Sequence, residues 1–364
     1  GQNGGLIGAD INAPDAWDTL SSAENIVVAV LDTGIRATHE DLAQNIWTHA
    51  ATGGYGWNAL AQTELPADDE GHGSLVAGVL GAAGNNGKGV TGVAWSVKLM
   101  ACKCFDSHRL GYDSDIIACI DFARTNGARV INASVGAYSY SHALSNAIYA
   151  ARTDGIIFVA ACGNDGRNID FQPYYPASYE IDNIVSVGFS SRHDTPGTIS
   201  NFGTNHVHLV APGEAMYSTF FASDASYLGG AFLVGTSLAA PQVSGALALT
   251  LARFPGEPHT LSIQRLLAAV DSIPSLDGRC KTGGRLNLKQ LLNPAIHLRI
   301  TGTGVEWIIE GRTSPQRICI IESSPDLQNW SVAGVRVSGS NGRFEFSDFF
   351  GNLDRGFYRV LSPE

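Results

Sequence analysis

Charge is scarce in this sequence, and the charge that is present is mostly negative. Charged side chains make up 16% of the 364 residues, against about 25% in an average soluble domain. The chain has 23 Lys and Arg against 34 Asp and Glu, which gives a formal net charge of −11. We therefore do not expect it to bind nucleic acid through a broad basic surface.

Long apolar runs are also missing. The stretches at 26–31 and 156–161 have the length of a β-strand, whereas a membrane span needs about 20 apolar residues. We therefore expect no membrane insertion. With 44% hydrophobic residues and 42 glycines, the composition indicates a glycine-rich globular protein and excludes a disordered chain.

The start of the chain, Gly1-Gln2-Asn3, has neither an initiator Met nor the pattern of a signal peptide. This beginning favours a mature, processed form of the protein.

Residues 24–253 alternate short apolar runs with helix-length segments. Runs rich in Val, Ile and Ala that are separated by helices are typical of a parallel sheet covered on both faces. The expected strands are 26–31, 97–104, 130–133, 156–161 and 184–188, and the expected helices are 114–126, 141–153, 237–253 and 261–270. The sequence thus predicts a doubly wound, mostly parallel α/β domain over residues 1–294.

Residues 295–364 have a different pattern. They contain no Lys and no long helical pattern, and short alternating stretches lie between Gly, Ser, Asn and Pro residues. This pattern predicts a small all-β domain over 295–364. Its aromatic residues, which include Trp307 and Trp330, form either its core or an exposed face that adsorbs the protein to a surface.

The six cysteines do not have the spacing of a zinc ribbon or a zinc finger. Two interpretations are open: buried apolar thiols, or disulfides whose pairing the sequence does not give. A disulfide between Cys280 and Cys319 is one hypothesis, because these residues lie on either side of the change in pattern.

Three polar side chains stand at the ends of predicted elements. Asp32 follows a buried strand, His72 opens a helix of small residues, and Ser237 begins another helix. Each has an ordinary explanation alone, as a turn, a structural histidine and a helix cap. In the order Asp, His, Ser within one α/β unit, they match a catalytic triad. Asn164, at the end of another strand, adds a side-chain amide that can donate to an oxyanion.

These four segments, in this order and at these spacings, resemble the motifs of the subtilisin-like serine proteases, and the resemblance covers residues 1–293. It implies that Ser237 is the nucleophile, that His72 is the general base and then the acid, and that Asp32 orients His72. Asn164 and the N–H of Ser237 would form the oxyanion hole. The implied protein is a secreted, monomeric endopeptidase of broad specificity, made with an N-terminal propeptide and acting on proteins and peptides through an acyl-enzyme.

The resemblance also implies a substrate cleft. An extended peptide would pair with two exposed edges, and the side chain before the scissile bond would enter a first pocket with uncharged walls, which favours apolar or aromatic residues. The substrate-binding residues that it implies are Gly111, Tyr112, Asp113, Ser134, Val135, Gly136, Ala161, Cys162, Gly163 and Tyr174. The acidic run at 68–70, beside His72, is either a solvated rim or a place for basic substrate side chains.

Subtilisin-like serine proteases often carry a structural calcium ion near the N-terminus, and oxygen ligands suit this cation. The resemblance places the ligands at Gln2, Asp41 and Asn86, while Lys88 brings a positive charge into the same loop.

The alternative function is that of a catalytically silent homologue, a binding or adhesion protein that acts through its C-terminal β domain. The complete set of Asp32, His72, Asn164 and Ser237 argues against this alternative.

Overall fold

The structure is a computed structural model. It describes residues 4–293, 297–302, 307–313, 316–326, 328–339, 342–348 and 357–362. Among these residues, no helix combines the length and the apolar character that crossing a bilayer requires.

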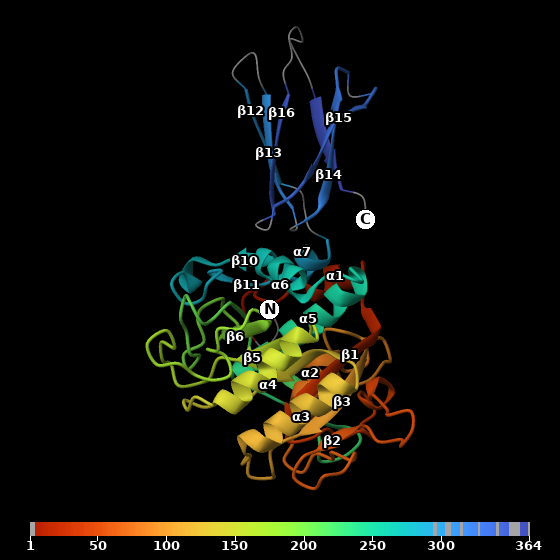
Figure 1. The fold of residues 1–364 in the computed structure, drawn as a ribbon, viewed down its shortest axis with the longest axis vertical. Coiled ribbons are helices and arrows are strands. Elements are labelled where there is room, and N and C mark those ends of the chain that lie inside the picture. Colours follow the sequence, from red (N-terminus) through yellow and green to blue (C-terminus); the bar gives the residue numbers. More distant parts are fainter. Residues whose placement is uncertain are drawn as a thin grey trace.

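A nine-stranded sheet crosses the part of the structure that covers residues 4–293, in the order β10-β11-β7-β6-β5-β4-β1-β3-β2 (Figure 1). The strands from β11 to β2 in this order are parallel to their neighbours, and β10 pairs antiparallel with β11. Their bounds are β1 Ser22–Asp32, β2 Gly56–Asn58, β3 Ser96–Lys103, β4 Ala128–Ala133, β5 Ile157–Ala161, β6 Ile184–Ser190, β7 Leu209–Pro212, β10 Val270–Ser272 and β11 Gly284–Leu286. A separate hairpin joins β8 (Tyr217–Phe220) to β9 (Ser226–Gly229).

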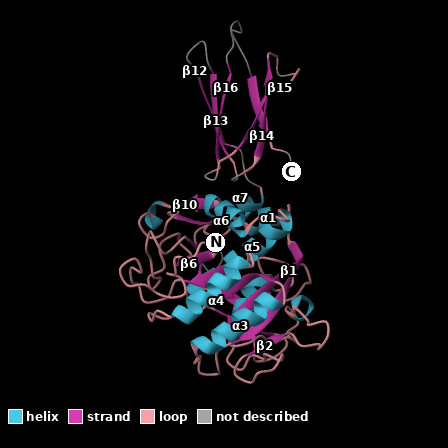
Figure 2. Cartoon of the chain, viewed as in Figure 1, coloured by secondary structure: helices cyan, strands magenta, loops and turns pink. Residues whose placement is uncertain are grey.

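Helices cover both faces of this sheet. Figure 2 shows α3 and α4 side by side on one face. The helices are α1 Ala13–Trp17, α2 His72–Gly81, α3 Asp113–Thr125, α4 His142–Thr153, α5 Thr236–Arg253, α6 His259–Ala268 and α7 Leu288–Leu292, with short 3-10 turns at Ala43–Asn45 and Pro274–Leu276. The predicted doubly wound α/β architecture is confirmed.

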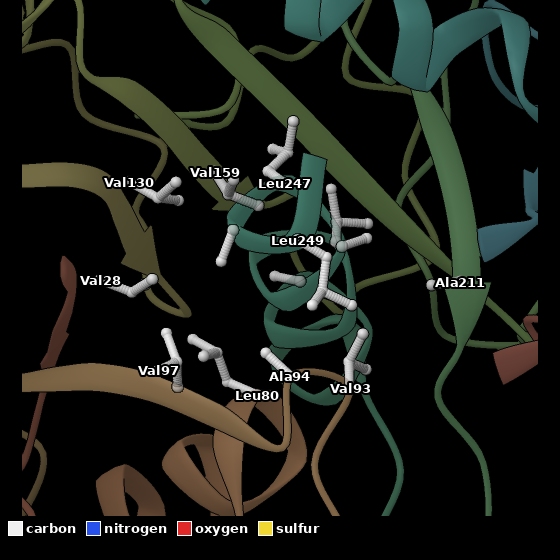
Figure 3. Close-up of a cluster of buried hydrophobic side chains, with 14 of the residues drawn as sticks. Val28, Leu80, Val93, Ala94, Val97, Val130, Val159, Ala211, Leu247 and Leu249 are labelled. Carbon is white, nitrogen blue, oxygen red and sulfur yellow. The ribbon is translucent and has the colours of Figure 1, made fainter. Parts of the chain in front are cut away.

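Side chains of the central strand β1 alternate between two hydrophobic cores. Val28 and Val30 pack into a core shared with α2 and α5, while Ala29 and Leu31 pack into a core shared with α3 and α4. Successive residues of a strand point to opposite faces of the sheet, so a continuous apolar run fills both cores. Figure 3 shows the first core, with Val28 and other strand residues facing α5.

Two helix starts illustrate local capping. Ser141 caps α4, because its hydroxyl accepts a hydrogen bond from the N–H of Leu144. The start of α3 differs from the prediction: the helix begins at Asp113 rather than at Ser114, and the carboxylate of Asp115 accepts from the N–H of Tyr112. A carboxylate near the first turn also suits the positive end of the helix dipole.

Two small antiparallel sheets lie beyond α7 (Figure 1). One has the order β12-β13-β16 and the other the order β15-β14-β17. Their strands are β12 His297–Gly302, β13 Trp307–Arg312, β14 Ile318–Ser324, β15 Ser331–Val337, β16 Arg343–Asp348 and β17 Phe357–Leu361. A separate hydrophobic cluster between them contains Ile309, Ile321 and Phe346.

Candidate active site

Asp32 and His72 meet at the carboxyl edge of the large sheet. Asp32 is the last residue of β1 and is 1% exposed, while His72 is the first residue of α2. Nδ1 of His72 lies 2.8 and 2.9 Å from the two carboxylate oxygens of Asp32. Since a carboxylate can only accept, this contact places the ring proton on Nδ1 and leaves Nε2 as the basic nitrogen.

A glycine allows this close approach. A Cβ atom on Gly73 would lie 2.0 Å from the carbonyl oxygen of Gly34 and 3.1 Å from Cβ of Asp32. The first turn of α2 therefore packs directly against the end of β1, and this contact brings the imidazole within hydrogen-bond distance of the carboxylate.

The electrostatic balance at His72 favours its charged form. Burial disfavours the imidazolium, but the charge of Asp32 and its hydrogen bond outweigh burial and raise the pKa of His72 above 6.5. An imidazole that gains a proton readily, and whose cation has a buried counter-ion, suits a general base.

The first acid of the run before His72, Asp68, bonds to groups of the surrounding chain. Asp68 accepts hydrogen bonds from the hydroxyls of Thr33 and Ser74 and from the N–H groups of Glu70, Gly71 and Ser74. Its carboxylate thus joins the residue after Asp32 to the turn that carries His72.

The other two acids of this run have cationic partners. Asp69 lies 2.7 Å from Nζ of Lys103, which is 4% exposed. Glu70 accepts from the N–H of His72 at 2.9 Å and from Nε of Arg109 at 2.8 Å. Each of these two acids therefore has a cationic partner, and the side chain of Asp69 remains 53% exposed.

Ser237 and Asn164 face a common space beside Gly235. Ser237 is the second residue of α5, and Gly235 just before it has φ 151°, a conformation that favours glycine. A Cβ atom on Gly235 would lie 3.3 Å from Nδ2 of Asn164 and 3.5 Å from Oγ of Ser237. The amide donor and the hydroxyl therefore lie on the same side of this glycine.

Thr236 orients the Asn164 amide. Its N–H and its hydroxyl donate to Oδ1 of Asn164 at 2.9 and 3.1 Å. With the oxygen held by two donors, the Nδ2 group of Asn164 is left to act as a donor.

A chain of hydrogen bonds supports the backbone of Ser237. The hydroxyl of Ser134 donates to the carbonyl of Ser237 at 3.0 Å and accepts from Nδ2 of Asn132 at 2.9 Å. Asn132 in turn accepts from the hydroxyl of Ser244 at 2.8 Å. Asn132 and Ser244 are fully buried. In the sequence, Asn132 and Ser244 are marked only as polar residues within otherwise apolar segments.

No hydrogen bond joins Nε2 of His72 to the hydroxyl of Ser237 among the described residues. Catalytic hydrogen bonds of this kind are often long before substrate binds and shorten in the complex.

The expected substrate residues differ in exposure, and the side chain of Cys162 is buried. Tyr112 is 79% exposed beside the start of α3, and Gly136 directly follows the segment of Ser134. Cys162 is fully buried, with Sγ 3.1 Å from the carbonyl of Asn201. Burial raises its pKa to about 12, so the thiol stays protonated at neutral pH and is not a reactive group.

The cysteines do not form the hypothesised disulfide. All six are free and buried. Cys280 belongs to the core beneath α3 and α4, and Cys319 to the separate core of the small sheets. The apolar-thiol interpretation is the one that the structure supports.

The expected calcium ligands do not fit a cation as they are arranged. Oδ1 of Asp41 accepts from Nδ2 of Asn86 at 2.7 Å, and Oδ2 accepts from the N–H of Val90 and the hydroxyl of Tyr227, both at 2.9 Å. Lys88 donates its N–H to Oδ1 of Asn86. Protein donors thus already satisfy both side chains.

The charges around these residues also argue against a cation. Nζ of Lys88 lies 3.0 Å from Glu40, next to Asp41, and so brings a positive charge to the same place. Gln2 lies outside the described residues. Within the described part of the chain, no group of three or more His, Cys, Asp or Glu side chains is arranged to hold a metal ion.

Comparison with known proteins agrees with this geometry. The model of the subtilase family matches residues 23–274. Thermophilic serine proteinase of Bacillus sp. (strain AK1) is 36% identical over 64% of this chain and 54% of that protein. Subtilisin DY of Bacillus licheniformis is 37% identical over 64% of this chain and 78% of that protein, and thermitase of Thermoactinomyces vulgaris is 33% identical over 66% and 79%.

A solved structure shares the fold. The crystal structure of a cold adapted subtilisin-like serine proteinase superposes with a TM-score of 0.64 and 26% identity, covering 74% of this chain and 90% of that one. Together with the family match and the arrangement of Asp32, His72, Asn164 and Ser237, this places the chain in the subtilase family of serine proteases.

Proposed function

We propose that this protein is a serine endopeptidase of broad specificity that cleaves peptide bonds through an acyl-enzyme on Ser237. The observation that carries the proposal is the pairing of His72 with the buried Asp32, at the edge of the sheet where Ser237 and Asn164 share one face of Gly235. Family membership supports the same reaction class.

In the proposed mechanism, Nε2 of His72 takes the hydroxyl proton of Ser237 as Oγ attacks the scissile carbonyl carbon. Asp32 stabilises the imidazolium that forms. The oxyanion of the tetrahedral intermediate accepts hydrogen bonds from Nδ2 of Asn164 and from the N–H of Ser237. That N–H is one of the first four of α5, which the helix leaves without partners.

Collapse of the intermediate breaks the C–N bond, and His72 gives its proton to the leaving amine. Water then attacks the acyl-enzyme with His72 again acting as the base, which releases the acid and restores Ser237.

The substrate would bind as an extended strand between the segments at 111–113 and 134–136. Recognition through the backbone supports a broad specificity. The uncharged walls at Val135, Ala161 and Gly163 support an apolar or aromatic residue before the scissile bond.

Two further parts of the proposal concern the whole chain. We place the end of the catalytic domain near residue 294, with a β domain after it, since the small sheets have their own core. Secretion, a propeptide in the precursor and action as a monomer rest on family resemblance. A calcium ion is not part of the proposal, since Asp41 and Asn86 have protein partners.

The test is hydrolysis of casein and of a peptide library by the wild type and by Ser237→Ala, together with labelling by a fluorophosphonate. We expect cleavage and covalent labelling of the wild type and loss of both in the variant. Equal activity in both proteins, or no activity and no labelling in either, would contradict the proposal and favour a binding role for the C-terminal sheets.

A further inference from the structure

Glu70 caps the helix that carries the proposed catalytic base. His72 is the first residue of α2, so its N–H is one of the groups that a helix leaves without a partner in its own backbone. The carboxylate of Glu70 accepts from this N–H through Oε2 at 2.9 Å. The next two N–H groups of α2 also have side-chain acceptors, Thr33 and Asp68. Glu70 therefore holds the backbone of His72 directly.

Arg109 binds the same carboxylate from a separate loop. Its Nε and Nη2 lie 2.8 and 2.7 Å from Oε1 of Glu70. The side chain of Glu70 is 18% exposed, whereas that of Arg109 is 60% exposed. The two oxygens of one carboxylate thus join the backbone of His72 to a guanidinium.

The loop at 106–110 holds Arg109 in place. Oδ1 of Asp106 accepts from the N–H groups of His108 and Leu110 at 2.8 and 2.9 Å, and the N–H of Arg109 donates to the carbonyl of Asp106 at 3.0 Å. Arg109 has φ 60°, a left-handed conformation that is uncommon for residues other than Gly, Asn and Asp. Such a conformation persists where surrounding contacts hold it, and the ion pair with Glu70 is one of these contacts.

The charges of the pair act on the imidazole in opposite directions. Burial and the nearby Asp32 have the largest effects on the pKa of His72; beyond these, Arg109 lowers this pKa and Glu70 raises it. A cation disfavours the imidazolium and an anion favours it. Each charge of the pair therefore offsets the effect of the other.

Other charged groups around His72 have partners of their own. Asp69 lies 2.7 Å from Nζ of Lys103. Arg36, whose N–H donates to a side chain of α2, lies 2.7 Å from Asp224. Further titratable groups on the elements around His72 are Asp32, Asp68, Cys104, Asp106 and His108. Glu70 differs from all of these because it also holds the backbone of His72.

We propose that Glu70 and Arg109 act as one positioning unit for the catalytic base: Glu70 holds the backbone of His72, and Arg109 balances the charge of Glu70 so that the imidazole stays an effective base at lower pH. The inference rests on the proposed function, to which it adds two positioning residues. Without Arg109, the carboxylate that holds His72 would also favour the protonated imidazole, which cannot take a proton from Ser237.

The experiment compares the pH dependence of kcat/KM, which reports the free enzyme, on one peptide p-nitroanilide. Glu70→Gln removes the negative charge and keeps an oxygen that can accept from the N–H of His72, so the midpoint of the acid limb is expected to move to lower pH. Arg109→Gln leaves the charge of Glu70 unbalanced, so the midpoint is expected to move to higher pH. The double variant is expected to lie between the two single variants. Arg109→Lys keeps the charge and is expected to keep the midpoint of the wild type.

Salt and a second ion pair provide the controls. Because Arg109 is exposed, both shifts should shrink between about 0.1 and 1 M salt, as the Debye length falls from about 10 to about 3 Å. Arg152→Gln removes an arginine from an ion pair with Asp182 in the last turn of α4 and is expected to leave the midpoint unchanged. Glu70→Ala also removes the acceptor for the N–H of His72 and is expected to lower kcat more than Glu70→Gln does.

Active-site titration with a fluorophosphonate corrects each kcat for the fraction of active enzyme. Midpoints that move in the same direction in Glu70→Gln and Arg109→Gln overturn the inference. Midpoints that stay in place in both labelled variants also overturn it, since a merely structural pair would change kcat or the Tm alone. These outcomes differ from failure of the proposed function, in which neither the wild type nor any variant is labelled and no peptide is cleaved.

Discussion

The carboxylate of Asp32 meets Nδ1 of His72 through both of its oxygens, at 2.8 and 2.9 Å, in a position that is 1% exposed. An acceptor on this side fixes the tautomer that leaves Nε2 free to take a proton. We predict that Asp32→Asn lowers kcat by about 10⁴-fold, the loss known for the same change in another serine protease triad, because the amide favours the wrong tautomer.

The measurement for Asp32→Asn is kcat on a peptide p-nitroanilide, with Ser237→Ala as the matched control for background hydrolysis. A loss below about tenfold would mean that Asp32 does not set the tautomer of His72.

The pH dependence of the reaction should reflect the same pair. His72 must be neutral to act as a base, and Asp32 raises its pKa above 6.5 despite the opposing effect of burial. We predict that kcat/KM rises with pH and that its acid limb has a midpoint above 6.5. In the residual activity of Asp32→Asn, this limb should move to lower pH, since the opposing effect of burial then acts alone.

The raised pKa of His72 also makes folding stability depend on pH. Stability should fall as the pH rises, whereas activity should increase. Because the folded pKa of His72 is raised, the contribution of the pair to the free energy of unfolding is complete below the unfolded value of about 6.5. It is lost as the pH rises through the folded value. A midpoint of the kcat/KM limb below 6.5 would contradict both statements.

Thr236 orients the amide of Asn164. Variants of the two residues therefore distinguish the direct contact of Asn164 with the oxyanion from the supporting role of Thr236. We predict that Asn164→Ala lowers kcat by about 10²–10³-fold, the range measured for loss of this donor in subtilisin, with little change in KM. Thr236→Val removes the hydroxyl at 3.1 Å but keeps the N–H at 2.9 Å, so its loss should be smaller.

These two variants are compared by kcat and KM on one peptide p-nitroanilide. If Asn164→Ala raised KM and left kcat unchanged, the amide would contact the ground state of the substrate rather than the oxyanion.

The sequence predicted the ends of strands well because the relevant signals are local. Asp32 follows a continuous apolar run, and such a run in a parallel sheet ends at the edge where ligands bind. The fold class and the position of β1 followed from that pattern. The start of α3 was harder to predict, because both Asp113 and Ser114 are suitable residues at a helix start. The helix begins at Asp113, where the carboxylate of Asp115 accepts from the N–H of Tyr112.

The missed features depend on partners that are distant in the sequence. Lys103 is 4% exposed, and its Nζ donates to Asp69 and to the carbonyls of Thr33 and Phe105. The hydroxyl of Tyr227 reaches Asp41 across 186 positions. No local pattern indicates such pairs, so the partners of Asp69 and Asp41 do not follow from the sequence.

The loop around Asp41 provides the last prediction. Its carboxylate is held by Asn86, Val90 and Tyr227, and Lys88 pairs with Glu40 beside it. Burial and the charge of Asp41 raise the pKa of Tyr227, so its hydroxyl stays protonated and donates. Because protein donors take the places of a cation, we predict that excess chelator leaves the Tm unchanged.

The matched variant is Tyr227→Phe, which leaves the Asp41 carboxylate short of one donor. Loss of a buried partner of this kind costs about 1–3 kcal/mol, and we expect the Tm to fall by a few degrees. Thermal unfolding with and without chelator and added calcium checks both statements. A Tm that drops by several degrees in chelator and recovers with calcium would show that an ion displaces these hydrogen bonds and that the loop is a metal site after all.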